Sequence, residues 1–374
     1  MSHDPFAPAA LPRRTILVTG AGGPGAVNLT RSLRLGEADL FLVGGDASPY
    51  YLHLAETHVR RLLPRWSDEE EFLHAVRDLV REFRVDLILP NASIDGAIFT
   101  RHRDLLGAPV FLPGAEAFRI GESKWASWQV WQAAGLPVPR TMLLETPGDV
   151  VAAFRDLGTT PVWVRGAGIP GRGIGVASLP CRTVDQALQW IDYWQGWGGM
   201  IASEFLPGEN LTWLGVFDRG RLVASQSRQR DAYVIPHVSP SGITGAPAIS
   251  HTVHRQDLNA LGPAAVLAID PAYTGPGFVD FKADGTGRLR ITEINVGRFG
   301  TTHHFYSVAG ANFPRLVVCL ALGLPLPAWV RPFDVLPADL YWVRTLDAGP
   351  VLLTREEIRR VEQGDEPRPP EPRT

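Results

Sequence analysis

The sequence predicts an α/β protein in which a unit with a parallel sheet precedes a larger part built of antiparallel sheets. In the first third of the chain, apolar runs of strand length alternate with segments of helical spacing, which is typical of a doubly wound parallel sheet. Farther along, pairs of apolar runs flank short turns that contain glycine, and this pattern indicates hairpins. The 374 residues are enough for two or three packed domains.

The composition excludes several classes of protein. Hydrophobic residues make up 45% of the chain, so it can bury a core of ordinary size. The net charge of -3 gives no general basic field, and we expect no nucleic acid as partner. The two cysteines lack metal-ligand spacing and favour a reducing compartment. Without a signal-peptide pattern, or an apolar run of the roughly 20 residues that span a bilayer, we expect a cytoplasmic protein with no membrane partner.

The elements of the first unit follow in order. We expect a strand over 15–19, a glycine turn over 20–25, a helix over 26–35, a strand over 40–44, an amphipathic helix over 69–83, and strands over 85–90 and 110–113. Strands that alternate with helices in this way predict a parallel sheet.

The glycine turn has two interpretations. Gly20, Gly22 and Gly25 match the spacing of a dinucleotide-binding turn, and Asp46 lies where an acid would bind the ribose. A tight turn that packs the helix on the sheet needs the same glycines. We favour the packing interpretation because nothing farther along resembles a hydride-transfer site.

The second part of the chain mixes helices with hairpins. We expect a helical stretch over 115–134, strands over 161–165 and 176–179 around a glycine-rich loop, a helix over 183–194, a strand over 200–206, paired strands over 211–217 and 221–228, helices over 254–269 and 312–322, and a disordered tail over 363–374. The hairpins predict antiparallel sheets.

One hairpin carries the strongest chemical signal. The runs 277–282 and 288–295 flank an Asp-Gly turn, so Asp280 can lie opposite Glu293, and Glu293 and Asn295 point to the same face. Two carboxylates and an amide oxygen suit Mg²⁺, with substrate phosphates completing the shell. A solvated strand face with ordinary turn chemistry explains the hairpin equally well when it is taken alone.

Cations in two other places suggest phosphate binding. Only Lys124 and Lys282 are lysines among 36 basic residues, so a retained lysine can mark a site that needs a compact ammonium. The loop 166–175 contains five glycines, which let backbone N–H groups approach phosphate oxygens, and Arg172 lies at its tip. The alternative is a disordered hairpin tip.

Taken together, these parts resemble the ATP-grasp superfamily, in particular its carbamoyl-phosphate-synthetase-like and biotin-carboxylase-like branch of carboxylate–amine ligases. The resemblance runs from about residue 15 to about residue 322. It implies a loose N-terminus over 1–13, a Rossmann-like pre-ATP-grasp domain over 14–115, a two-lobed ATP-grasp domain over 116–322 with a lid lobe over about 124–203 and a metal-hairpin lobe over about 204–322, and a C-terminal extension with a disordered tail over 323–374.

The resemblance also implies roles for matching positions. Those assigned to ATP are Lys124, Arg165, Gly171, Arg172 and Gly173 at the phosphates, Glu204, Phe205 and Leu206 at the adenine edge, and either Glu209 or Asn210 at the ribose. Asp280, Glu293 and Asn295 match the ligands of Mg²⁺ or Mn²⁺. Arg298 resembles the arginine near the transferred phosphoryl group, although it stands one place later than in the family, and Lys124 and Arg172 would help it offset charge during the reaction.

The implied reaction is a ligation. ATP would activate a small carboxylate as an acyl phosphate, and an amine or another nucleophile would displace the phosphate. Candidate substrate-binding residues are Arg228, Arg230, Ser241 and Gly242, because an arginine pair can hold a carboxylate with two hydrogen bonds. The alternatives are a phosphotransferase on the same fold and a nucleotide-binding module without chemistry. The branch often forms homodimers, so a homodimer is possible.

Overall fold

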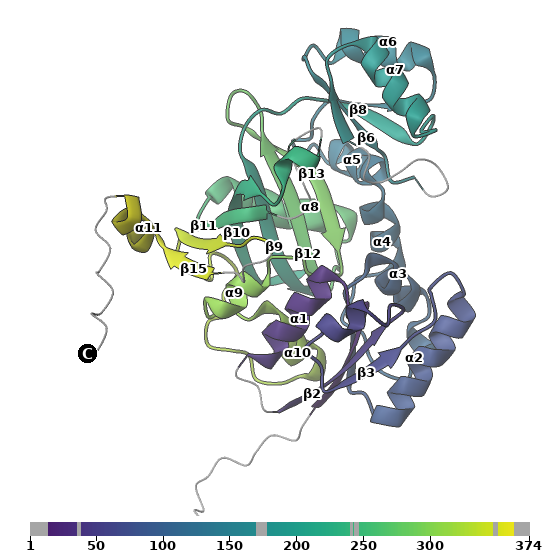
Figure 1. The fold of residues 1–374 in the computed structure, drawn as a ribbon, viewed down its shortest axis with the longest axis vertical. Coiled ribbons are helices and arrows are strands. Elements are labelled where there is room, and N and C mark those ends of the chain that lie inside the picture. The colour runs from purple at the N-terminus through teal and green to yellow at the C-terminus, as the bar shows by residue number, and fades with distance from the viewer. Residues whose placement is uncertain are drawn as a thin grey trace, which may run out of the picture.

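The computed structural model describes residues 14–35, 39–169, 178–239, 242, 247–346 and 351–362. Three sheets form three stacked parts (Figure 1): a parallel sheet at the bottom of the view, a large antiparallel sheet in the middle and a small antiparallel sheet at the top. The predicted phosphate-binding residues Gly171, Arg172 and Gly173 and the predicted substrate-binding Ser241 lie outside the described residues. Along the described part of the chain, no helix is long and apolar enough to cross a membrane.

The parallel sheet confirms the predicted doubly wound unit. Its strands lie in the order β3-β2-β1-β4. The elements of this part are β1 (Arg14–Thr19), α1 (Pro24–Arg34), β2 (Leu40–Asp46), the short helix η1 (Tyr51–Leu54), β3 (Val59–Leu62), α2 (Glu69–Phe83), β4 (Leu87–Pro90), α3 (Ser93–Arg101), the short helix η2 (Arg103–Leu105) and α4 (Ala115–Glu122). The expected strand over 110–113 is reduced to a single bridge between Val110 and Ile88.

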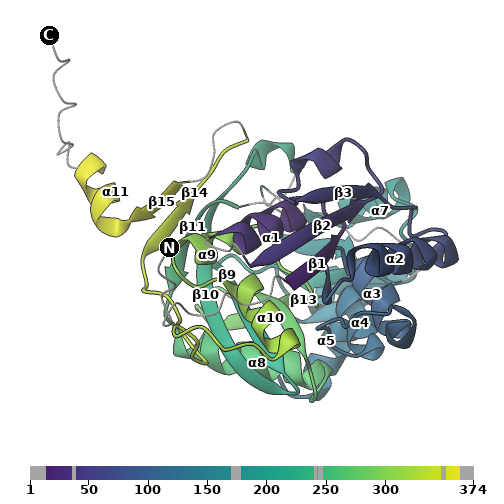
Figure 2. The same ribbon diagram turned by 90° about the horizontal axis from the view of Figure 1, so that it is seen from below.

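Alternation along β1 explains why helices cover both faces of this sheet. Leu17 belongs to one apolar cluster with Val76 of α2, whereas Ile16 belongs to a second cluster with Leu29 of α1. Successive strand residues point to opposite faces, so a continuous apolar run requires cover on both sides. Figure 2 shows α1 and α2 on opposite sides of the strands.

The glycine turn before α1 is tightly packed. The backbone N–H of Gly22 donates to the Asp46 carboxylate at 2.8 Å. A Cβ on Gly22 would lie 2.6 Å from the backbone carbon of Tyr51, and one on Gly25 would lie 2.5 Å from the side-chain nitrogen of Asn91. These approaches leave no room for a side chain, which agrees with the packing interpretation of the turn.

The small antiparallel sheet forms a lobe with its own core. Its strands lie in the order β5-β8-β6-β7 and are covered by α6 and α7 (Figure 1). The elements are α5 (Lys124–Ala133), which leads into the lobe, β5 (Thr141–Leu144), α6 (Pro147–Asp156), β6 (Val162–Gly166), β7 (Ser178–Cys181), α7 (Val184–Tyr193) and β8 (Met200–Glu204). The apolar cluster of this lobe shares no residue with the other two clusters.

The expected helix over 115–134 is two helices. Ser123 separates α4 from α5, with an extended backbone (φ -97°, ψ 112°), and its side chain accepts a hydrogen bond from the N–H of Ala126. A serine in this role satisfies a free N–H group at the start of a helix, so it favours a new start over continuation. The break places Lys124 in the first turn of α5.

The large sheet has seven strands in the order β13-β12-β9-β10-β11-β14-β15. The elements are β9 (Asn210–Asp218), β10 (Arg221–Tyr233), the short helix η3 (Pro236–Val238), β11 (Pro247–Val253), α8 (Gln256–Ile269), β12 (Gly275–Ala283), β13 (Leu289–Val296), α9 (His304–Val308), α10 (Phe313–Leu322), β14 (Leu340–Val343), β15 (Val351–Thr354) and α11 (Arg355–Glu362). Because β14 pairs with β11, the sheet continues past residue 322.

Alternation along β9 gives this sheet two different faces. Trp213 is fully buried and lies against Gly262 of α8, where a Cβ would be 2.3 Å from the indole ring. Thr212 points to the other face, where β12 and β10 place Asp280 and Arg228 in register with it. One face is therefore core, and the other carries charged and polar side chains.

Candidate active site

A cavity of about 540 Å³ lies between the small lobe and the polar face of the large sheet. The residues that line it come from both lobes and from α5, with Lys124, Arg165 and Glu204 on one side and Asp280, Glu293, Asn295 and Arg298 on the other. The fold thus brings together most of the residues that the sequence singled out across 175 positions.

Part of the cavity lining is apolar. It is lined by Pro139, Trp163, Phe205, Leu206 and Phe281. The Trp163 and Phe205 rings lie 6.4 Å apart, and the Phe205 N–H is held by the Thr159 hydroxyl at 3.2 Å. The Glu204 side chain is held by Arg140, whose Nε donates to it at 3.0 Å. This part of the lining offers flat, apolar surfaces of the kind that accept a planar base.

The hairpin of β12 and β13 contributes charged and polar side chains to the lining. Asp280 lies directly across from Glu293, as the sequence predicts, and Asn295 is two residues farther along β13 on the same face. Asp280 also accepts hydrogen bonds from Thr212 Oγ1 at 2.9 Å and from Arg230 Nη2. Three oxygen-bearing side chains therefore line the charged part of the cavity.

Cations from the other lobe face Glu293. Lys124 Nζ lies 3.6 Å from one oxygen of Glu293, and Arg165 Nη1 lies 3.7 Å from the other. Burial lowers the pKa of the Lys124 ammonium, and the Glu293 carboxylate opposes that shift. Arg165 Nη2 also donates to the carbonyl of Thr292 at 2.8 Å. Two cations and one carboxylate leave this part with a surplus of positive charge.

Arg298 completes the charged part of the lining. Its Nη2 donates to Asn295 Oδ1, and its guanidinium lies 5.7 Å from the centre of the Phe278 ring. Burial lowers the pKa of Arg298, and Glu293 and Asp280 oppose that shift. Among the residues that the structure describes, the buried Nε atoms of Arg298 and Arg165 have no hydrogen-bond partner. Buried donors of this kind suit an anionic ligand.

The oxygen donors also fit a divalent cation. No cluster of three or more His, Cys, Asp and Glu side chains that could hold a metal occurs within the described ranges. Mg²⁺ needs no such cluster, because one or two carboxylates plus substrate phosphates satisfy it. Asp280 and Glu293, with the amide oxygen of Asn295, provide that smaller set.

The start of β9 separates the two predicted ribose ligands. Asn210 lines the cavity, and its Oδ1 accepts from Lys282 Nζ at 3.3 Å. The Glu209 carboxylate instead pairs with Arg255 at 2.8 Å, and half of its side chain is exposed. Neighbouring strand residues point to opposite faces, which explains why only one of the two reaches the cavity.

Sequence reasoning assigned Lys282 no function. Its ammonium donates to the carbonyl of Gly208 at 3.1 Å, and it lines the same cavity as Lys124. Both lysines of the chain therefore lie at one site. The composition could have indicated a role for Lys282, because only two of the 36 basic residues are lysines.

The predicted substrate-binding residues are spread out. Arg228 lines the cavity and is almost fully buried. Arg230 also lines it, but its Nε and Nη2 donate to Thr212 Oγ1 at 2.9 and 2.7 Å, and Nη2 also contacts Asp280. Gly242 has a φ of 70° and belongs to the segment between β10 and β11. Arg230 is thus bound within the protein, whereas Nη1 of Arg228 has no hydrogen-bond partner in the described part of the chain.

Known proteins resemble this chain in sequence and in fold. No protein-family model matches it. It is 26% identical over 235 residues to the D-alanine–D-alanine ligase of Laribacter hongkongensis, covering 62% of this chain and 73% of that one. It is 27% identical over 250 residues to the D-alanine–D-alanine ligase of an Azoarcus species, covering 63% and 76%.

Solved structures share the fold over most of the chain. N5-carboxyaminoimidazole synthetase of Staphylococcus aureus matches with a TM-score of 0.65 at 16% identity, covering 89% of this chain and 83% of that one. An L-amino acid ligase of Bacillus licheniformis matches with a TM-score of 0.64 at 16% identity, and the match covers 89% of this chain and 79% of that one. A third match is the biotin carboxylase domain of Hydrogenobacter thermophilus 2-oxoglutarate carboxylase, which was solved with MgADP. Its TM-score is 0.64 at 15% identity, and the match covers 88% of this chain and 73% of that one. The chain is therefore similar in sequence to D-alanine–D-alanine ligases, and it shares its fold with a carboxylase domain, a synthetase and a ligase.

Proposed function

We propose that the chain uses ATP to activate a small carboxylate as an acyl phosphate and then joins it to an amine in the cavity between the lobes. The supporting observation is the distribution of charge in that cavity. Apolar and aromatic residues form part of the lining, and Lys124, Arg165 and Arg298 line it together with the carboxylates of Asp280 and Glu293. A nucleotide has the same polarity, with a planar base and a charged triphosphate.

The hairpin residues Asp280, Glu293 and Asn295 would hold Mg²⁺ or Mn²⁺. When bound, the metal neutralises charge on the phosphate oxygens. Lys124 and Arg165 reach Glu293 from the opposite lobe, so they would contact the phosphates from the other side. Arg298, next to Asn295, would stabilise the charge that develops on the transferred group. Arg172 belongs to the same proposal but lies outside the described residues.

The reaction divides into two displacements. The substrate carboxylate oxygen bonds to the γ-phosphorus while the bond to the β-phosphate oxygen breaks, which releases ADP. The amine nitrogen then bonds to the acyl carbon, inorganic phosphate leaves, and the amine proton passes to solvent. The cations of the cavity hold the reacting groups in place and offset their charge, which is the main task of a protein in phosphoryl transfer.

Hydroxylamine tests the two-step route. With ATP, Mg²⁺ and an accepted carboxylate, hydroxylamine should capture the acyl phosphate as a hydroxamate, in an amount equal to the ADP released. Release of ADP with a stable phosphorylated product and no hydroxamate would indicate the phosphotransferase instead. ATP binding without ADP release across amino acids and small carboxylates would leave only a binding module. The relatives are named as ligases, so they favour the first outcome.

The names of the relatives suggest where the substrate search should begin. D-alanine–D-alanine ligases and an L-amino acid ligase act on amino acids, as their names state. We therefore place amino acids first among the carboxylates and amines for this chain. A homodimer also belongs to the proposal, because the Hydrogenobacter thermophilus domain was solved as a dimer. Light scattering at micromolar concentration measures it directly.

The position of Asn210 leads to a prediction for ATP affinity. Asn210→Ala should raise the KM for ATP about tenfold, because losing one ligand hydrogen bond of about 1.4 kcal/mol has that effect. Glu209→Ala is the matched control and should change the KM less than about twofold, since Glu209 pairs with Arg255 at the surface. Steady-state ADP release with varied ATP measures both. The opposite ranking would place Glu209 at the ribose.

A further inference from the structure

A second, smaller cavity lies beside the metal hairpin. Its volume is about 290 Å³, and it shares four lining residues with the first cavity: Lys124, Glu293, Asn295 and Arg298. These are residues that we assign to the metal, the phosphates or the transferred group. The second cavity shares none of the aromatic residues at which we expect the base. It therefore meets the first cavity only where the reaction would take place.

The remaining walls of the second cavity come from α3, α4 and β13. The residues that line this cavity and not the first are Ser93, Gly121, Glu122, Ile294 and Val296. Figure 1 shows α3 and α4 one above the other along the side of the large sheet, and α4 contacts both α3 and β13. A Cβ on Gly121 would clash with the side chain of Val296, so α4 packs closely on the strand. This packing places Glu122, the last residue of α4, beside β13.

The strand β13 faces the second cavity with its open edge. It is the first strand in the order of the seven-stranded sheet, so the backbone N–H and C=O groups on its outer side have no strand partner. Ile294 and Val296 line the cavity, although their side chains belong to the apolar core. Their backbone is therefore the part that faces the cavity, where its carbonyl oxygens can accept hydrogen bonds from a ligand.

Glu122 gives this cavity a carboxylate that needs a counterion. Along the described part of the chain, Glu122 forms no ion pair or hydrogen bond, whereas Glu293 lies 3.6 Å from Lys124, and Arg298 donates to Asn295. Partial burial raises the pKa of Glu122, and the positive charge of Arg298 opposes that shift without cancelling it. A cationic ligand next to Glu122 would supply the missing charge.

We infer that the second cavity binds the amine substrate, and that the Glu122 carboxylate, the Ser93 hydroxyl and the backbone edge of β13 hold its ammonium group. An ammonium has three N–H donors, which this set of acceptors can satisfy. The inference rests on the proposed function and adds a separate place for the nucleophile. The bound ammonium releases one proton to solvent before its nitrogen attacks the acyl carbon, and a second proton leaves as the amide forms.

Competition with hydroxylamine tests this site. Hydroxylamine is uncharged at neutral pH, so it can capture the acyl phosphate without an ammonium. The full chain with ATP, Mg²⁺, an accepted carboxylate and hydroxylamine should form hydroxamate at a steady rate. Ethylamine and glycinamide carry an ammonium and no carboxylate, and at least one of them should suppress that rate. Ethanol is the uncharged counterpart of ethylamine and should not suppress it at the same concentration.

Glu122→Gln should raise the concentration of amine that halves the rate about tenfold, because the ammonium loses a charged acceptor. Glu122→Asp keeps the charge and should raise it less. Each rate is divided by the rate of the same variant without amine, so a change in turnover does not affect the comparison. Glu116→Gln is the control and should match the wild type, because Glu116 lies on the same helix, is exposed and lines neither cavity.

Two results would overturn the amine site. One is that neither amine suppresses hydroxamate formation by the wild type, and the other is that Glu122→Gln is suppressed at the same concentration as the wild type. Absence of hydroxamate from the wild-type reaction without amine would instead contradict the proposed function, on which the site depends. Melting curves verify that each variant is folded.

Discussion

Glu293→Gln is expected to lower the rate of ADP formation about 10³-fold while the protein remains folded. The substitution keeps the shape of the side chain and removes the charge that faces Lys124 at 3.6 Å and Arg165 at 3.7 Å. A carboxylate ligand of a phosphate-bound metal contributes about 4 kcal/mol to transition-state stabilisation, and each 1.36 kcal/mol is about a factor of ten in rate. A coupled assay for ADP, with saturating ATP and Mg²⁺, measures the loss.

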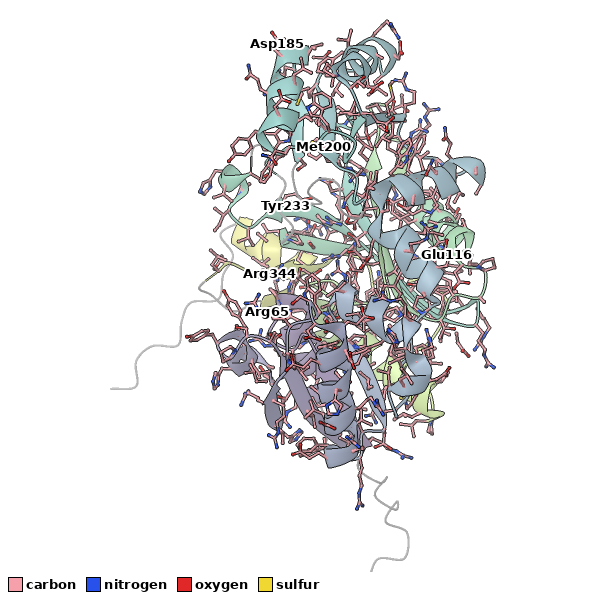
Figure 3. The ribbon with its side chains drawn as sticks, turned by 90° about the vertical axis from the view of Figure 1, so that its right-hand side faces the viewer. Arg65, Glu116, Asp185, Met200, Tyr233 and Arg344 are labelled. Atoms are coloured by element: carbon pink, nitrogen blue, oxygen red, sulfur yellow. The ribbon has the colours of Figure 1, made fainter. Side chains whose placement is uncertain are left out.

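Glu116→Gln provides the control for this experiment. Glu116 is an exposed residue of α4 that pairs with Arg119 at 2.6 Å, and Figure 3 shows it on the side of the molecule opposite Arg344. Solvent screens an exposed pair of this kind, so activity and melting temperature should match the wild type. Turnover of Glu293→Gln within about threefold of the wild type would contradict the role of the hairpin.

Arg230→Gln is expected to cost about 3 to 5 kcal/mol in the free energy of unfolding. Arg230 donates to Asp280 and to Thr212, and the side chains of Arg230 and Asp280 are only 14% and 19% exposed. Removing the cation leaves the mostly buried Asp280 carboxylate with Thr212 as its remaining hydrogen-bond donor among the described residues, and breaking a buried ion pair by removing one partner is strongly destabilising. Urea denaturation without nucleotide, followed by circular dichroism, measures the change.

Arg219→Gln tests the same chemistry at the surface. Arg219 pairs with Asp218 at 3.2 Å at the tip of the β9–β10 hairpin, and its side chain is 86% exposed. Solvent screens such a pair, so the loss should stay below about 1 kcal/mol. An equally small loss of unfolding free energy in Arg219→Gln and Arg230→Gln would contradict the stabilising role that we assign to the buried Arg230–Asp280 pair.

Local features of this site were predictable from the sequence because their partners are close along the chain. The pairing of Asp280 with Glu293 follows from a hairpin with a short turn, and the alternation of strand residues places Asn295 on the same face. The parallel sheet followed from alternating strands and helices. The choice between Glu209 and Asn210 as the ribose ligand could be made only once the first residue of β9 was known. A shift of one residue along a strand moves a side chain to the opposite face of the sheet.

Contacts between residues far apart in the sequence could not be predicted in this way. Arg230 was predicted to bind substrate, but its contact with Asp280 depends on β9 lying between β10 and β12, an order that the sequence does not specify. Non-local strand pairing decides this case. The roles of Gly171, Arg172, Gly173 and Ser241 stay predictions.

The pairing of β14 with β11 affects how the protein should be shortened or fused. A chain that ends at residue 322, where the sequence alone predicts the end of the ATP-grasp domain, would lack β14 and leave β11 as an open edge. Unpaired backbone N–H and C=O groups along such an edge recruit strands from other molecules, so the shortened product would tend to aggregate. Expression tags and fusion partners therefore belong after β15, beyond residue 354.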